Sequence, residues 1–108
     1  KIGGPMQLLL FKNFTKRINS TKRPDITQPD RSVTISAKDI ISVEHPTFKL
    51  SNVDLDINYA YFNGKYYYVD DVTLSNVAIY ELHCSMDHLA TYKDQIKSSS
   101  QYLLYASL

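Results

Sequence analysis

The sequence of 108 residues contains no tryptophan, one cysteine and no apolar run close to the length of a transmembrane helix. Such a helix needs about 18 apolar residues in a row, so we expect no membrane span. The lone Cys84 excludes a disulfide within the chain. The first residues, KIGGPMQLLLF, lack the long apolar core and the cleavage site of a secretory signal peptide. We therefore expect a soluble protein that is made in the cytoplasm.

Sequence motifs of catalysis and of cofactor binding are also missing. The chain has no glycine-rich phosphate loop, no nucleophile elbow and no dinucleotide-binding fingerprint. Asp54, Asp56 and Asn58 resemble the opening of a calcium-binding loop. However, the glycine that such a loop requires is Tyr59 here, and the required glutamate is Lys65. A solvated strand edge explains these acidic residues better.

Two further clusters of reactive side chains fail on strand geometry. His83 and Cys84 are adjacent in a predicted strand, so they point to opposite faces and cannot share a metal ion or form a nucleophile pair. Asp70 and Asp71 are adjacent in the same way, whereas general acid–base catalysis needs carboxylates that converge on one substrate. We therefore expect no catalytic residues, no metal site, no cofactor and no enzymatic activity.

Short apolar runs dominate what is present, and they predict strands within one domain, residues 1–108. Met6–Phe14 is a nearly continuous apolar run after Gly-Gly-Pro, which indicates a strand buried on both faces. Val33 and Ile35 alternate with small polar residues, as in a half-buried strand. Further strands are predicted over residues 39–46, 57–62, 65–74, 77–86 and 101–108.

The strongest local signal is Asn63-Gly64 between two of these runs. A type I′ hairpin turn needs positive φ at both central positions, which Asn-Gly supplies. With the strand that follows, this hairpin makes an antiparallel meander. Residues 87–98 then change to a helical period, with Ser85 or Asp87 as the candidate N-cap. The predicted fold is mainly β (α+β): an antiparallel sheet or meander with this one helix packed on it. The stripe that the helix would bury is Leu89, Tyr92 and Ile96.

Residues 15–32 form a long basic loop that has two prolines and neither helical nor strand periodicity. We expect this loop to be mobile in an isolated monomer and to be ordered by a partner. Residues 1–49 carry nine Lys/Arg and four Asp/Glu, whereas residues 50–108 carry three and seven. Such asymmetry suits head-to-tail packing of identical copies. The predicted charge-steering residues of the loop are Lys16, Arg17, Lys22 and Arg23, and the acidic groups that they would face are Asp54, Asp56, Asp70 and Asp71.

Five of the nine tyrosines lie on the predicted hairpin. Tyr59 and Tyr61 share one face of its first strand, whereas Tyr66 and Tyr68 oppose Tyr67 on the second. Aromatic side chains on both faces predict that the hairpin is buried twice, once on its own helix and once on another surface. Tyrosine suits a subunit interface because its ring supplies apolar area and its hydroxyl tolerates water. We therefore predict that these five tyrosines contact the next copy in an assembly.

Two stretches of the chain follow a recognisable order. The first, LLLFKNFTKRINSTKRP, is an apolar strand followed by Thr-Lys-Arg and Ser-Thr-Lys-Arg-Pro. The second is the aromatic and acidic run YYYVDDV, then an alternating strand that leads into Asp87, Leu89, Thr91, Tyr92, Lys93 and Ile96. Together they resemble the N-terminal region of tail knob and related tail proteins of small short-tailed bacteriophages. Those proteins are several times longer, so the chain corresponds to an N-terminal domain, a fragment or a short homologue.

The resemblance implies a structural protein of the phage virion, made in the bacterial cytoplasm. It implies a ring of six copies, or a tube, that is used in DNA delivery. The implied partners are the chain itself, other tail or collar proteins, and DNA passing through the tube. Two alternatives stay open. One is a carbohydrate- or host-surface-binding module in which Tyr66, Tyr67 or Tyr68 stacks on a sugar. The other is a small nucleic-acid-binding domain that uses the basic loop.

Overall fold

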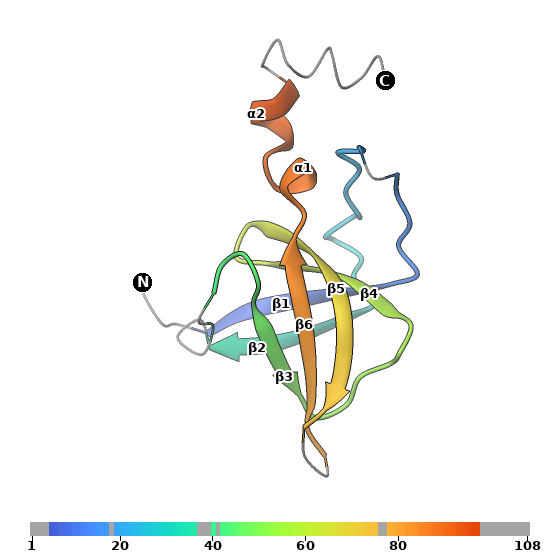
Figure 1. Ribbon diagram of the computed structural model, residues 1–108, viewed down its shortest axis with the longest axis vertical. Coiled ribbons are helices and arrows are strands. Elements are labelled where there is room, and N and C mark those ends of the chain that lie inside the picture. The colour runs from blue at the N-terminus through green and yellow to red at the C-terminus, as the bar shows by residue number, and fades with distance from the viewer. Residues whose placement is uncertain (1–4, 18, 37–39, 41, 76–77, 98–108) are drawn as a thin grey trace.

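The computed structural model of the protein is built on a six-stranded antiparallel sheet (Figure 1). It describes residues 5–17, 19–36, 40, 42–75 and 78–97. The strand order across the sheet is β2-β1-β4-β5-β6-β3, and two short helices follow β6 along the chain. The prediction of a mainly β fold is therefore confirmed. The elements are β1 (Pro5–Lys12), β2 (Arg31–Ser36), β3 (Thr47–Leu50), β4 (Ile57–Phe62), β5 (Lys65–Leu74), β6 (Tyr80–Met86), α1 (His88–Thr91) and α2 (Lys93–Lys97).

The predicted hairpin and meander form the centre of this sheet. Asn63 and Gly64 have φ values of 51° and 76°, so both central positions of the turn are left-handed, as a type I′ turn requires. β4 then pairs with β5, and β5 pairs with β6. β5 carries a bulge at Asp70, because Val69 lies opposite Cys84 while Asp71 lies opposite His83. The bulge keeps the apolar residues on both sides of it directed at the core.

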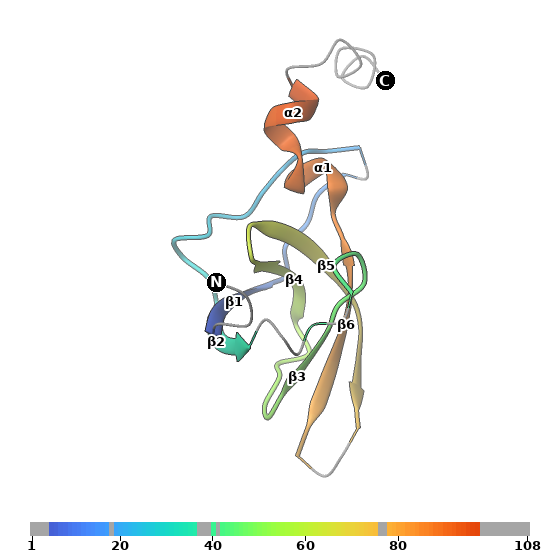
Figure 2. The same ribbon diagram turned by 90° about the vertical axis from the view of Figure 1, so that its left-hand side faces the viewer.

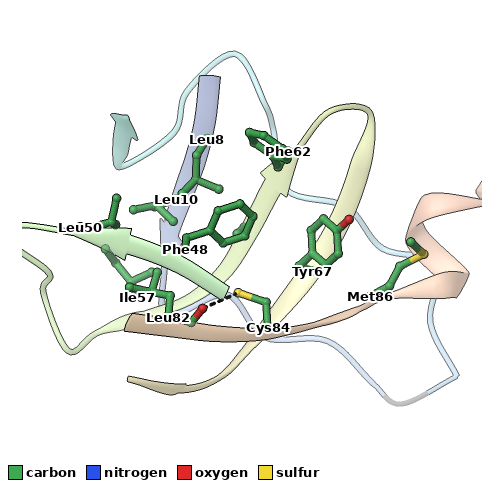
Figure 3. Packing of buried hydrophobic residues seen from close by; sticks show 11 residues of the cluster. Leu8, Leu10, Phe48, Leu50, Ile57, Phe62, Tyr67, Leu82, Cys84 and Met86 are labelled. Carbon is green, nitrogen blue, oxygen red and sulfur yellow. Dashed lines mark hydrogen bonds between the residues drawn. The ribbon is translucent and has the colours of Figure 1, made fainter. Parts of the chain in front are cut away.

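The sheet curls (Figures 1 and 2), and the main hydrophobic core lies on its inner face. Side chains from five strands meet there, with Phe48 of β3 packed edge-on against Phe62 of β4 at a centroid distance of 5.2 Å (Figure 3). β1 is buried on both faces, as predicted: Leu8 and Leu10 join this core, whereas Phe11 joins a second cluster on the outer face. The buried members of the main core are Leu8, Leu10, Phe48, Leu50, Ile57, Ala60, Phe62, Tyr67, Leu82, Cys84 and Met86.

The prediction of one continuous helix over residues 87–98 is wrong in detail. The helix ends at Thr91, and a second one begins at Lys93, because Tyr92 leaves the helical conformation with φ −107° and ψ 30°. The hydroxyl of Thr91 accepts a hydrogen bond from the backbone N–H of Tyr66 at 2.9 Å, which holds the last turn of α1 on β5. Ala90, rather than the predicted stripe, is the fully buried residue of α1.

The predicted strand over residues 39–46 is also wrong where the structure describes it. Ile40 and residues 42–46 contain no strand. Their backbone instead follows the edge of β6 irregularly, since the carbonyl oxygens of Glu44 and Pro46 accept hydrogen bonds from Met86 and Cys84. Pro46 has no N–H to donate to a ladder, and regular pairing begins at β3. The strand predicted over residues 101–108 lies outside the described residues.

Candidate functional site

Four of the five hairpin tyrosines lie on one face, the outer face of β4 and β5. Tyr59 and Tyr66 are buried, with 1% and 7% of their surfaces exposed, while Tyr61 and Tyr68 are partly buried. Their rings touch one another: the ring centroids of Tyr61 and Tyr66 are 4.8 Å apart, and those of Tyr59 and Tyr68 are 5.6 Å apart. Phe14, which immediately precedes the basic loop, lies against Tyr59 with their ring centroids 4.5 Å apart. We call these four tyrosines the tyrosine face.

Tyr67 points the other way, into the main core of the same chain (Figure 3). It is 3% exposed, and its hydroxyl donates a hydrogen bond to the backbone oxygen of Val43 at 2.8 Å. The hairpin is therefore buried on both faces, as predicted, but the second surface is the chain's own core rather than a neighbouring copy. The strands curl far enough to enclose that face, which alternation along one strand does not reveal.

The basic loop covers the tyrosine face through a buried ion pair. The ammonium group of Lys16 lies 2.6 Å from Oδ2 of Asp87, and the two side chains are 3% and 2% exposed. Tyr59 donates its hydroxyl proton to the same oxygen at 2.6 Å. The other oxygen, Oδ1, accepts the backbone N–H of Ala90 at 3.3 Å and so caps α1. We call Lys16, Tyr59 and Asp87 the Asp87 node.

Two other basic residues of the loop are also bound within the chain. The guanidinium of Arg23 donates to the backbone oxygen of Ala90 at 2.8 Å and lies over the ring of Tyr66. Lys22 donates to the backbone oxygen of Thr15 at 3.0 Å. Of the four predicted charge-steering residues, Arg17 and Lys22 are exposed. Contacts within the chain thus hold the loop, whereas the sequence analysis expected a partner to order it.

The four predicted acidic partners lie on the surface of the molecule. Asp54 forms an ion pair with Lys12 at 2.8 Å, and both side chains are well exposed. Asp70, the bulge residue of β5, accepts a hydrogen bond from the hydroxyl of Ser85 at 3.1 Å. Asp56 and Asp71 are exposed too. None of these four carboxylates is brought together with the predicted basic residues inside one copy.

Burial sets the acid–base properties of the tyrosine face. It raises the pKa of Tyr59 far above that of a free phenol, and the hydrogen bond to the Asp87 carboxylate raises it further. Burial, followed by the nearby charge of Asp87, raises the pKa of Tyr68 to about 12. A phenol with such a pKa stays protonated at neutral pH and is a poor base or nucleophile. The arrangement supports positioning of the loop and of α1 rather than proton transfer.

The remaining reactive side chains are held apart by the sheet. Cys84 is buried in the main core, and burial, followed by the charge of Asp70, raises its pKa to about 12. His83 projects from the opposite face of β6, where its ring contacts the hydroxyl of Thr73 at 3.0 Å. Among the residues that the structure describes, no group of three or more His, Cys, Asp or Glu side chains is placed to hold a metal ion.

The partner of Asp87 was not predicted from the sequence. Asp87 was one of two candidate N-caps, beside Ser85, and Lys16 was predicted to face a neighbouring copy. Lys16 and Asp87 are far apart in the sequence, and no local pattern links them. The sequence held one hint: in an extended backbone, Phe14 and Lys16 are two residues apart and point to the same face.

No family model, no curated protein and no solved structure matches this chain. Neither helix in the described part of the chain is long and apolar enough to cross a membrane.

Proposed function

We propose that this chain is a structural building block of a short bacteriophage tail, located in the virion. In this proposal, copies of the chain associate head to tail into a ring of six, or a tube, through which DNA passes. The ring contacts other tail or collar proteins. The chain then contributes binding surfaces and rigidity rather than catalysis.

One observation carries the proposal. The two stretches on which the phage-tail resemblance depends are far apart in the sequence, and they meet at the Asp87 node. The first stretch supplies Lys16 and Arg23, and the second supplies Tyr66, Asp87 and Ala90. The shared order of residues therefore corresponds to one packed unit, made of the meander, α1 and the loop that covers them. A pattern that specifies packing rather than a reactive centre is what a structural virion protein needs.

The contacts between copies must use surfaces that folding leaves free. The chain's own packing buries Tyr59, Tyr66 and Tyr67. The hairpin tyrosines that remain for an interface are therefore Tyr61 and Tyr68, which are only partly buried. Arg17 and Lys22 are the exposed members of the basic set. Lys22 already donates to the backbone oxygen of Thr15, so Arg17 is the residue that we expect to steer copies together. Exposed ion pairs contribute about 0.2–1 kcal/mol each. Charge would therefore set the register between copies, while apolar contacts would supply most of the affinity.

The mass of the purified protein in solution tests this proposal directly. Light scattering or native mass spectrometry should find a closed oligomer with a defined number of copies as the concentration rises. A protein that stays monomeric at high concentration would refute it. The variant Arg17→Glu should weaken association modestly, and more at low salt than at high salt, because salt screens exposed charges.

The same sample distinguishes the two alternatives. A nucleic-acid-binding domain predicts a monomer whose affinity for DNA falls steeply with salt, but Lys16 and Arg23 are already engaged within the chain. A sugar-binding module predicts a monomer with an exposed aromatic platform, but Tyr67 lies in the core and Tyr66 is covered. A tight, salt-sensitive complex of a monomer with DNA would favour the first, and glycan-array binding by a monomer the second.

A further inference from the structure

Leu55 is the most exposed of the large apolar side chains that the structure describes, with 79% of its surface accessible. It lies at the corner of a turn between β3 and β4, where the N–H of Ile57 donates to the oxygen of Asp54 at 3.2 Å. The backbone N–H of Asn13 donates a hydrogen bond to the backbone oxygen of Asp56 at 3.1 Å, and Lys12 forms an ion pair with the Asp54 carboxylate. The backbone on both sides of Leu55 is thus fixed while its side chain projects into solvent.

A cavity of about 250 Å³ lies between the two edge strands of the sheet. β2 and β3 approach each other there without forming a ladder. The apolar part of the lining comes from Ile35 on β2, from Ile40 and from Phe48 on β3, while Thr47 and the exposed Lys49 add polar groups. A cavity of roughly 150 Å³ with an apolar lining is enough to hold benzene, so this one is large enough for a leucine side chain.

We infer that Leu55 of one copy inserts into the cavity between β2 and β3 of the next copy. The inference rests on the proposed function, because it names the contact that would build the ring. The charges agree with this pairing. Leu55 is flanked by two exposed aspartates, of which Asp54 is paired with Lys12, and the exposed Lys49 lines the cavity. The turn is fixed before binding, so little ordering entropy opposes the contact.

A single copy cannot make this contact with itself. The connection that carries Leu55 runs along the right-hand side of the molecule in Figure 1, whereas β2 ends on the left-hand side and the cavity lies beside that end. The Leu55 turn and the cavity are therefore different surfaces on different sides of one copy. Contacts of that kind are heterologous, and they close into a ring when the rotation between neighbours permits.

The substitution Leu55→Ala in the full chain tests the inference, with sedimentation velocity over a range of concentrations as the measurement. It should weaken self-association roughly 10- to 100-fold, which corresponds to the loss of one buried leucine side chain. Leu74→Ala is the matched control, because Leu74 is also an exposed leucine, at 59%, on the end of β5. It should leave association within about twofold of the wild type. Ile35→Trp, which fills the cavity, should weaken association as Leu55→Ala does.

The outcomes separate this inference from the proposed function. If the wild-type protein forms the ring and Leu55→Ala forms it equally well, the Leu55 contact is refuted while the ring stands. If the wild-type protein is a monomer at every concentration, both fail. The charge pairing has its own test: Lys49→Glu and Asp56→Lys should each weaken association, and the double variant should restore it. A double variant no better than either single one would overturn the pairing of these two residues.

Discussion

We expect Lys16→Met to lower the free energy of unfolding by about 3–5 kcal/mol, the usual effect of removing one partner from a buried ion pair. The Lys16 side chain is 3% exposed and Asp87 is 2% exposed, with 2.6 Å between the charged atoms. Methionine keeps most of the length of lysine but leaves the Asp87 carboxylate with the Tyr59 hydroxyl and the Ala90 amide as its donors. Small domains are stable by about 5–15 kcal/mol in total, so this is a large share.

Urea unfolding followed by circular dichroism measures the effect, with Lys22→Met as the matched control. Lys22 belongs to the same loop, but it is exposed and its ammonium donates to a backbone oxygen of that loop, so its loss should change stability by about 0.5 kcal/mol or less. Asp87→Asn completes a double-mutant cycle with Lys16→Met. The double variant should lose clearly less than the sum of the two single losses. Additive losses, or a loss below about 1 kcal/mol for Lys16→Met, would refute the view that the Asp87 node is a coupled, buried pair.

Three further outcomes follow from the geometry. Gly64→Ala should destabilise the hairpin by about 1–2 kcal/mol in urea unfolding, since a side chain at φ 76° is strained even where space is open. The thiol of Cys84, whose burial raises its pKa to about 12, should react with a thiol reagent at pH 8 only after denaturant is added; rapid reaction of the folded protein would contradict its burial. The raised pKa values of Tyr67 and Tyr68, about 12 against 10.0 for a free phenol, favour the folded state below pH 10. That contribution should be lost as the pH rises through about 12, which unfolding at a series of pH values would measure.

Local patterns were sufficient to predict most of the strands. The Asn63-Gly64 turn, the alternation in β6 and the apolar run of β1 each constrain the backbone within a few residues, and all three match the structure. The helix was predicted less well, because it breaks at Tyr92, next to a hydrogen bond between Thr91 and Tyr66 on β5. Such a tertiary contact leaves no trace in helical periodicity.

The candidate site was harder to predict, because its key contacts join distant segments. Alternation correctly divided the tyrosines between two faces, but it could not tell that the sheet curls around Tyr67 and encloses it. Charge composition correctly marked the loop as basic, but it could not tell that Lys16 is paired with Asp87 and buried. Both errors come from treating a polar or amphipathic side chain as exposed when the fold supplies its partner.

The position of β3 in the sheet has a consequence for how the protein forms on the ribosome. β3 is synthesised directly after the β1–β2 half, yet it lies at the far edge, and Thr47 pairs with His83 of β6. Phe48 and Leu50 therefore stay exposed on the nascent chain until β6 has emerged. Pairings between distant segments make folding slow, because a long loop must close before any contact stabilises it. A chaperone that shields short apolar segments during synthesis would therefore have β3 among its binding segments.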